Sequence, residues 1–435
     1  MKVVVIGAGL GGLPTAYELR HRLPAEHTVT LISDRPKFTF IPGLIRVALN
    51  LKPLQELQLD LAELTKRHGL EWIEGKVTAL DPNAKRIAVG ETQTVDYDYA
   101  AIATGPFLAF DAIPGLGPHG GYTHSVCSSD CALKARAAWL KFLADPGDLV
   151  VGAVPGVGCF GPAYEFVLMA EWELRRLGLR DRVSITFITP EPYAGHLGLD
   201  GLSNSRELTE KLLKEREIKV VNQARITGVD SHAIALADGR KIPFKYAMVL
   251  PAFEGAKFIQ DVPGLGNEKR LIPVLPTYEH PKYPSIYALG VSVELPQTKP
   301  ALTALSLPKT GQMTEAMGLA VAHNIAVALG AIEDAWKTPT LEAVCFAEFG
   351  DTGIAYVAAP ILPDPVTGKR RYSYAGKGRW VNWVKAAFEK YFLLKIKWGL
   401  GLPWFEILAL RIVFGLSLLK NCESRAKTPI PSWLD

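Results

Sequence analysis

The chain has 435 residues, 48% of them hydrophobic and 21% charged, a composition typical of a globular protein with two or three domains. Its net charge of +4 indicates no particular partner, and we expect no nucleic acid to bind. The five cysteines are widely spaced and include no CxxC pair, which argues against a disulfide framework or a zinc site. Reactive thiols remain compatible with this pattern.

The N-terminus predicts a dinucleotide-binding turn. A strand is expected over Lys2–Ile6, followed by the glycine-rich turn 7–12, a helix over 14–22 and a second strand over 28–33. Since the apolar run leads straight into this turn, we expect no cleavable signal peptide. Such a turn brings backbone N–H groups and the positive end of a helix to a pyrophosphate. The expected cofactor contacts are Gly7, Ala8, Gly9, Gly11 and Gly12, with Ser33 or Asp34 on the ribose.

Two later strands also predict a flavin-binding fold. Residues 97–106 end in Ala-Thr-Gly, and residues 285–291 end in Ala-Leu-Gly. Both resemble the FAD-contacting strands of the pyridine-nucleotide-disulfide-reductase superfamily. The resemblance implies FAD contacts at Thr104, Gly105 and Gly290.

The same resemblance implies the domain organisation. The FAD-binding domain would be discontinuous, formed by residues 1–110 and 250–325. A second Rossmann-like domain would be inserted at 111–249, and residues 326–435 would form a C-terminal quinone- and membrane-docking region of amphipathic helices. The expected fold class is therefore α/β with two Rossmann-like dinucleotide-binding domains.

The second glycine turn, residues 152–161, departs from the pattern for nicotinamide binding. A strand over 147–152, the turn, a helix over 163–177 and a strand over 184–189 repeat the βαβ order. The turn contains Cys159, which is either a small buried apolar residue or a thiol with chemistry of its own.

Three cysteines share a distinctive context. Cys127 lies in HSVCSSD, Cys159 in GCFGPAYEF and Cys345 in EAVCFAEFGD. Together with the FAD turn, the PKTG segment 308–311 and the EPYAGH segment 191–196, they resemble the sulfide:quinone oxidoreductases over essentially the whole chain.

This resemblance implies that Cys159 and Cys345 form a redox pair beside the flavin. Hydrosulfide would attack a disulfide or polysulfide bridge, the thiolate of Cys345 would attack the flavin, and the sulfur chain would stay on Cys159 until its release as polysulfide or sulfur. Because this chemistry needs thiolates, a positive local field or a nearby base is expected. Cys127 matches the family's third cysteine, while Cys131 stands where some relatives carry a histidine, which weakens a proton relay there.

Further site residues follow from the same resemblance. His196 and Glu165 are candidate acids or bases, with a structural role as the alternative for His196. Lys309 and Gly311 would lie at the flavin end of a helix that starts near Thr310, where a cation and the helix dipole stabilise reduced flavin. The other expected FAD contacts are Val77 and Lys385, and the residues expected to sandwich the quinone ring are Phe346 and Phe388.

The C-terminus is basic and aromatic. Residues 369–397 contain many Lys and Arg but only one acid, Glu389. A helical wheel over 380–398 gathers Trp380, Val384, Phe388, Tyr391, Phe392 and Leu394 near one side, with lysines 385, 390, 395 and 397 interleaved. Residues 399–419 are apolar but interrupted by Pro403, Glu406 and Arg411. We expect helices lying in a membrane interface instead of a spanning helix, with a hairpin packed on the protein as the alternative.

The sequence therefore predicts a monotopic, peripheral flavoenzyme of a prokaryotic cell membrane. It would bind FAD, oxidise hydrogen sulfide and reduce a membrane quinone such as ubiquinone at the surface of the lipid bilayer; a homo-oligomer is left open. Three alternatives are the flavin subunit of a flavocytochrome c sulfide dehydrogenase, a type II NADH:quinone dehydrogenase and a non-enzymatic FAD-binding redox sensor.

Overall fold

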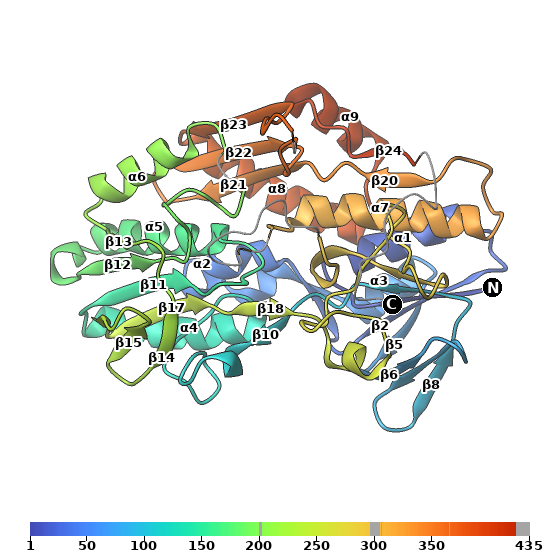
Figure 1. Ribbon diagram of the computed structural model, residues 1–435, viewed down its shortest axis with the longest axis horizontal. Helices are drawn as coiled ribbons and strands as arrows, with labels where there is room; N and C mark the ends of the chain where they lie inside the picture. The colour runs from blue at the N-terminus through green and yellow to red at the C-terminus, as the bar shows by residue number, and fades with distance from the viewer. Residues whose placement is uncertain (200–201, 296–304, 306, 365, 423–435) are drawn as a thin grey trace.

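Two parallel sheets lie side by side, and a C-terminal antiparallel sheet with two helices lies across them (Figure 1). The computed structural model describes residues 1–199, 202–295, 305, 307–364 and 366–422. The predicted α/β fold class with two Rossmann-like units is confirmed.

The first sheet has the strand order β19-β9-β1-β2-β5, and all of its strands are parallel. Strands β1 and β2 have the predicted bounds, whereas β9 and β19 are shorter than expected. The bounds are Lys2–Ile6 (β1), Thr28–Ser33 (β2), Glu71–Glu74 (β5), Tyr99–Ile102 (β9) and Ile286–Ala288 (β19). Helix α1 (Gly12–Arg22) packs closely on α7 (Gly311–Ala328), since a Cβ on Gly318 would lie only 2.2 Å from Thr15 Oγ1.

The second sheet has the order β13-β12-β11-β17 and is also parallel. Its strands are Leu149–Ala153 (β11), Ile185–Ile188 (β12), Lys219–Val221 (β13) and Tyr246–Leu250 (β17), and helices α4 (Ser129–Ala144) and α5 (Gly161–Arg176) pack on it. Helix α5 starts two residues before the predicted position, because Pro162 in its first turn needs no hydrogen-bond partner for a backbone N–H. The domain limits given above stay predictions.

Small antiparallel elements complete these units. They are the sheet β6-β7-β8 (Val77–Asp81, Arg86–Val89, Gln93–Asp96), the sheet β14-β15-β16 (Ile226–Val229, Ala233–Leu236, Lys241–Pro243), and the pairs β3 (Lys37–Thr39) with β4 (Gln58–Asp60) and β10 (Phe107–Ala109) with β18 (Ala252–Glu254). Shorter helices are α2 (Leu44–Ala48), α3 (Leu61–Arg67) and α6 (Ser205–Glu215).

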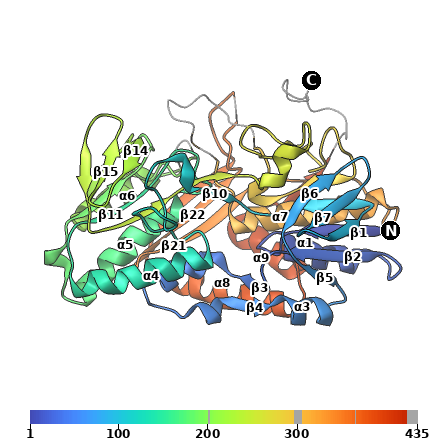
Figure 2. The ribbon, with the colours of Figure 1, turned by 90° about the horizontal axis from the view of Figure 1, so that it is seen from below.

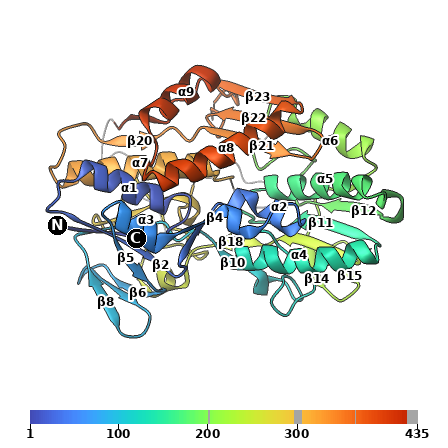
Figure 3. The ribbon, with the colours of Figure 1, turned by 180° about the vertical axis from the view of Figure 1, so that it is seen from behind.

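The C-terminal sheet is antiparallel, in the order β21 (Ala343–Glu348), β22 (Gly353–Ala359), β23 (Tyr372–Lys377). Helix α8 (Trp380–Lys397) packs on this sheet and runs beside the β3–β4 pair, and α9 (Trp404–Phe414) follows it (Figures 2 and 3). A last pair joins β20 (Lys337–Pro339) to β24 (Leu419–Asn421).

Helix α8 exposes only part of the side that the helical wheel predicted to face outward. Phe392, expected on the outer side, packs on Phe38 and Phe40, and the side chain of Lys395 is completely buried. Trp380 and Leu394 of the predicted side are exposed, and so are Trp383 and Trp398, which the wheel did not place there. Lys395 can face inward because buried carboxylates of other helices neutralise its charge.

Candidate functional site

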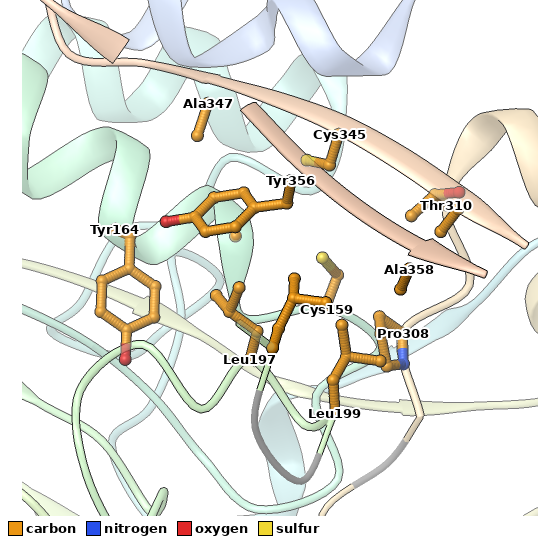
Figure 4. A pocket seen from close by; sticks show the side chains of 13 residues that line it. Cys159, Tyr164, Leu197, Leu199, Pro308, Thr310, Cys345, Ala347, Tyr356 and Ala358 are labelled. Carbon is orange, nitrogen blue, oxygen red and sulfur yellow. The ribbon is translucent and has the colours of Figure 1, made fainter. Parts of the chain in front are cut away.

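Cys159 and Cys345 line one small apolar cavity of about 50 Å³ (Figure 4). Cys345 belongs to β21, and Cys159 lies in the glycine turn between β11 and α5. The remaining lining residues come from β21 and β22 (Ala343, Ala347, Tyr356, Ala358), the start of α5 (Gly161, Tyr164), the loop after β12 (Leu197, Leu199, Leu202) and the entry to α7 (Pro308, Thr310).

Alternate side chains of β21 face two different environments, the thiol cavity and an aromatic cluster. Ala343, Cys345 and Ala347 face the cavity, because side chains two residues apart lie on the same side of a strand. Phe346 faces away and contacts Trp380 and Phe414, with ring centroids 6.5 and 6.1 Å apart. The C-terminal sheet therefore lies between the thiol cavity and helix α9.

Phe388, the second residue expected at the quinone, belongs to a different aromatic cluster from Phe346. Its ring lies 6.5 Å from Phe40 and 5.9 Å from Phe392. A sandwich between Phe346 and Phe388 therefore stays a prediction.

The thiols lie in surroundings that favour their protonated form. Burial raises the pKa of Cys159 to about 11 and those of Cys345 and Cys127 to about 12. The ammonium group of Lys385 lowers the pKa of Cys345, but burial outweighs it. A positive charge therefore acts on Cys345 but does not outweigh burial, and the expected positive local field or nearby base stays a prediction.

Glu165 and Lys385 form a buried ion pair between α5 and α8. Burial raises the pKa of Glu165, and the lysine opposes that shift. Both groups also influence the pKa of Cys345, so they lie close to it. The structure thus brings together one candidate base and one expected flavin-side cation.

His196 and Cys127 are not part of the cavity wall. The wall takes Leu197 from the His196 segment, while His196 packs edge-on against Tyr193 with ring centroids 5.1 Å apart. Cys127 lies just before α4 and is near enough to raise the pKa of Cys159 slightly. Their chemical roles stay predictions.

The first glycine turn has open space for a cofactor next to Gly9. A Cβ on Gly9 or Gly105 would meet nothing within 4 Å, whereas one on Gly7 would lie 2.3 Å from the carbonyl oxygen of Ala103. Gly7 therefore allows the turn to close on β9, and Gly9 leaves space beside the start of α1. Thr104 follows β9 at the same edge of the sheet. These residues fit a dinucleotide.

Other expected cofactor residues take part in helix packing, backbone hydrogen bonds or strand pairing. A Cβ on Gly11 would lie 2.5 Å from Thr314 Cγ2, and one on Gly290 would lie 2.9 Å from the same atom, so both let α7 approach. Ser33 Oγ accepts a hydrogen bond from Arg35 N and donates one to Arg35 O, which leaves Asp34, with an exposed side chain, as the freer ribose candidate. Val77 pairs with Val89 in the β6–β7 ladder, and Ala8 lies in the turn itself.

Lys309 connects the second glycine turn to the segment that follows β19. Its backbone N–H donates to Gly158 O at 3.4 Å, and its Nζ donates to Val293 O at 2.6 Å. Burial lowers the pKa of its ammonium group to about 8. Thr310 caps α7 by accepting a hydrogen bond from Met313 N, with Gly311 as the first helical residue. The PKTG segment therefore leads from the Cys159 turn to the expected flavin edge.

The sequence reasoning missed Tyr164, Tyr356 and the leucines of the cavity wall. The alternation Ala343, Cys345, Ala347 was visible and would have predicted a strand with small side chains on the side of the thiol. The leucines lie in a loop, and their positions in the sequence show no periodic pattern that would predict their place in the wall.

A comparison with known families gives the class of protein first. Residues 1–304 match the family described as pyridine nucleotide-disulphide oxidoreductase, to which the chain belongs. It is 36% identical over 430 residues to the sulfide-quinone reductase of Aquifex aeolicus, with 97% of each protein covered. Within that class the chain belongs to the sulfide:quinone oxidoreductase family, as its resemblance predicted, and it is a flavin-dependent enzyme.

Two further comparisons agree with this assignment. The solved structure of the sulfide:quinone oxidoreductase from Aquifex aeolicus matches with a TM-score of 0.93 at 34% identity, covering 98% of this chain and 99% of that one. The mitochondrial sulfide:quinone oxidoreductase of Dictyostelium discoideum is 24% identical over 363 residues, covering 80% of this chain and 77% of the relative.

Proposed function

We propose that the protein oxidises hydrosulfide at Cys159 and Cys345 and passes two electrons through FAD to a membrane quinone. The observation that carries this proposal is the cavity shared by the two thiols, which are far apart in the sequence. The capped start of α7 forms part of the same wall through Pro308 and Thr310, next to the lysine expected at the flavin.

The thiol pair would react by exchange. Hydrosulfide attacks the sulfur of Cys159 in a bridge to Cys345, which leaves a persulfide on Cys159 and a thiolate on Cys345. Renewal of the bridge with one more sulfur atom releases one proton and two electrons. Bound FAD supplies the two-electron acceptor. Lys385 would favour the thiolate of Cys345, and Glu165, its ion-pair partner, would take up the proton.

FAD would be held at the edge where β1 and β9 end. Gly9 and Gly105 leave the space, and the start of α1 offers its N–H groups to the pyrophosphate. Asp34 would bind the ribose. Lys309 and Gly311 would lie beside the flavin ring at the start of α7.

A lipid surface would bind the outer side of α8 and α9. Trp383, Trp404 and Ile412 are each more than 70% exposed, which is unusual for large apolar side chains. The other exposed apolar residues there are Trp380, Leu394, Trp398, Phe405, Leu408 and Val413, and Lys390, Lys397 and Arg411 add positive charge. Within the part of the chain that the structure describes, no helix is long and apolar enough to cross a bilayer. Quinone would enter from this side toward Phe346 and Phe388, and the prokaryotic membrane and a homo-oligomer stay predictions.

The test is flavin spectroscopy on purified protein without oxygen. Sulfide should bleach the flavin absorbance, and a soluble quinone analogue should restore it. Cys345→Ala should retain FAD but lose the bleaching by sulfide, because the outgoing thiolate is gone. Cys131→Ala, which removes a buried thiol outside the cavity wall, is the matched control and should still be bleached. Bleaching by NADH in place of sulfide would contradict the proposal.

A further inference from the structure

The loop after β12 holds one residue in a strained conformation. Leu197 has a φ of 59°, in the left-handed region that large side chains avoid. Its side chain forms part of the wall of the thiol cavity. Some other contact has to keep this backbone in place.

The contact is a hydrogen bond to Glu191, whose side chain is completely buried. The backbone N–H of Leu197 donates to Glu191 Oε1 at 2.5 Å. Two hydroxyl groups donate to the other oxygen, Tyr164 Oη at 2.6 Å and Thr189 Oγ1 at 2.7 Å. One carboxylate thus joins the residue that follows β12, helix α5 and the strained residue.

The same carboxylate connects two walls of the cavity. Tyr164 and Leu197 both line it, and the Tyr164 hydroxyl points away from the two thiols (Figure 4). This hydroxyl is the one that donates to Glu191. That hydroxyl also accepts the N–H of Gly195 at 2.9 Å, and Ser205 Oγ donates to the Gly195 carbonyl at 2.8 Å. Farther along, Arg370 binds the carbonyl oxygen of Leu199, so the loop has a second anchor that does not depend on Glu191.

We propose that Glu191 is a positioning residue that holds Leu197 in its strained conformation and thereby limits the room for sulfur atoms on Cys159. Without the carboxylate, Leu197 relaxes toward an ordinary conformation, and its side chain leaves the cavity wall. The second anchor at Leu199 confines this movement to the first half of the loop. The limit on sulfur atoms rests on the proposed function, whereas the hold on Leu197 does not.

The experiment uses the FAD-loaded protein and two readouts that need no sulfide. They are the rate at which N-ethylmaleimide alkylates Cys159 in the reduced protein and the hydrogen exchange of the loop amides, residues 193–199. Glu191→Ala should raise both rates about 10-fold or more, because a hydrogen bond that offsets backbone strain is lost. Glu191→Gln should change them little, since its amide oxygen still accepts from Leu197 and its NH₂ group can donate to the two hydroxyl oxygens.

A double-mutant cycle separates strain from simple loss of packing. Leu197→Gly and Leu197→Ala both remove the side chain, but only glycine adopts this φ without cost. Glu191→Ala should therefore raise the exchange rate about 10-fold in the Leu197→Ala protein and only slightly in the Leu197→Gly protein. An equal effect in both backgrounds would overturn the proposal, as would unchanged rates in the single Glu191→Ala variant.

Two further measurements cover the remaining outcomes. If Glu191→Ala loses FAD or fails to fold, Tyr164→Phe removes one partner of Glu191 and should raise loop exchange by a smaller factor; no increase would contradict the proposal. After turnover with sulfide, mass spectrometry of Cys159 should find longer sulfur chains in Glu191→Ala than in the unchanged protein. Failure of the protein to react with sulfide would contradict the proposed function, while the hydrogen-exchange cycle would still decide the role of Glu191.

Discussion

Lys395 of α8 provides the sharpest stability prediction, because its ammonium group forms ion pairs with two buried carboxylates. Its Nζ lies 2.6 Å from Glu315 Oε1 of α7 and 2.9 Å from Glu406 Oε2 of α9. Tyr391 Oη donates to Glu406 Oε2 at 2.7 Å. The cluster therefore joins the two C-terminal helices to the helix that starts at the expected flavin edge, and we consider its loss in Lys395→Met.

The size of the effect follows from the charges. Burial raises the pKa of Glu315 well above its usual range, and the two carboxylates raise the pKa of Lys395. The cluster is therefore close to one buried ion pair plus one protonated carboxyl. Removing the cation leaves an uncompensated buried charge, which costs about 3–5 kcal/mol. Because methionine fills most of the space of lysine, we assign the loss to charge.

The pH dependence has a definite sign. In Lys395→Met the buried carboxyls would have a pKa above that of the unfolded chain, so the native state would bind protons more tightly. The stability they contribute would be present in acid and lost as pH rises from about 4.5, the usual pKa of Glu, through the raised value. The deficit relative to the unchanged protein should therefore be larger at pH 8 than at pH 5.

Urea unfolding at both pH values, with hydrogen exchange of α8 as a local probe, measures this deficit. The matched control is Lys390→Met, which removes the same charge from an exposed position of the same helix. Adding Glu315→Gln to Lys395→Met should recover part of the loss, since it removes one stranded carboxyl. A Lys395→Met protein within about 0.5 kcal/mol of the control at pH 8, the range of ordinary surface substitutions, would refute this account.

Two other predictions concern the site and the outer surface. Lys385→Met should move the pH profile of sulfide-driven flavin reduction to higher pH, because the cation lowers the pKa of Cys345, whereas Lys385→Arg should largely preserve it. Stopped-flow spectroscopy would measure both profiles. An unchanged profile in Lys385→Met would show that Lys385 does not stabilise the thiolate. Replacing Trp404 and Ile412 together by Ser should weaken binding to anionic lipid vesicles at least about 100-fold, from roughly 1.5–3 kcal/mol per buried apolar side chain, as measured by cosedimentation. Equal binding by the doubly substituted protein would mean that this surface does not contact lipid.

The local signals in the sequence predicted much of the fold. Strands β1 and β2 and helix α8 begin where residue patterning placed them, and the order of strand, glycine turn and helix predicted both Rossmann-like units. These features depend on neighbours within a few residues, so a linear pattern can show them. The family resemblance added the roles expected of Cys159 and Cys345, whose separation no local pattern can bridge.

Only the tertiary structure decided how distant segments meet. It brought Cys345 of β21 to the cavity of Cys159 and set Glu191 beneath the strained Leu197. It also turned Lys395 inward, because carboxylates from α7 and α9 make its burial tolerable. A helical wheel counts a lysine as a solvent residue, since the sequence shows its charge but not the partners that neutralise it. The motifs of this sequence and their family resemblance could therefore indicate its chemistry, while the choice of buried charges and strained residues depended on contacts across the fold.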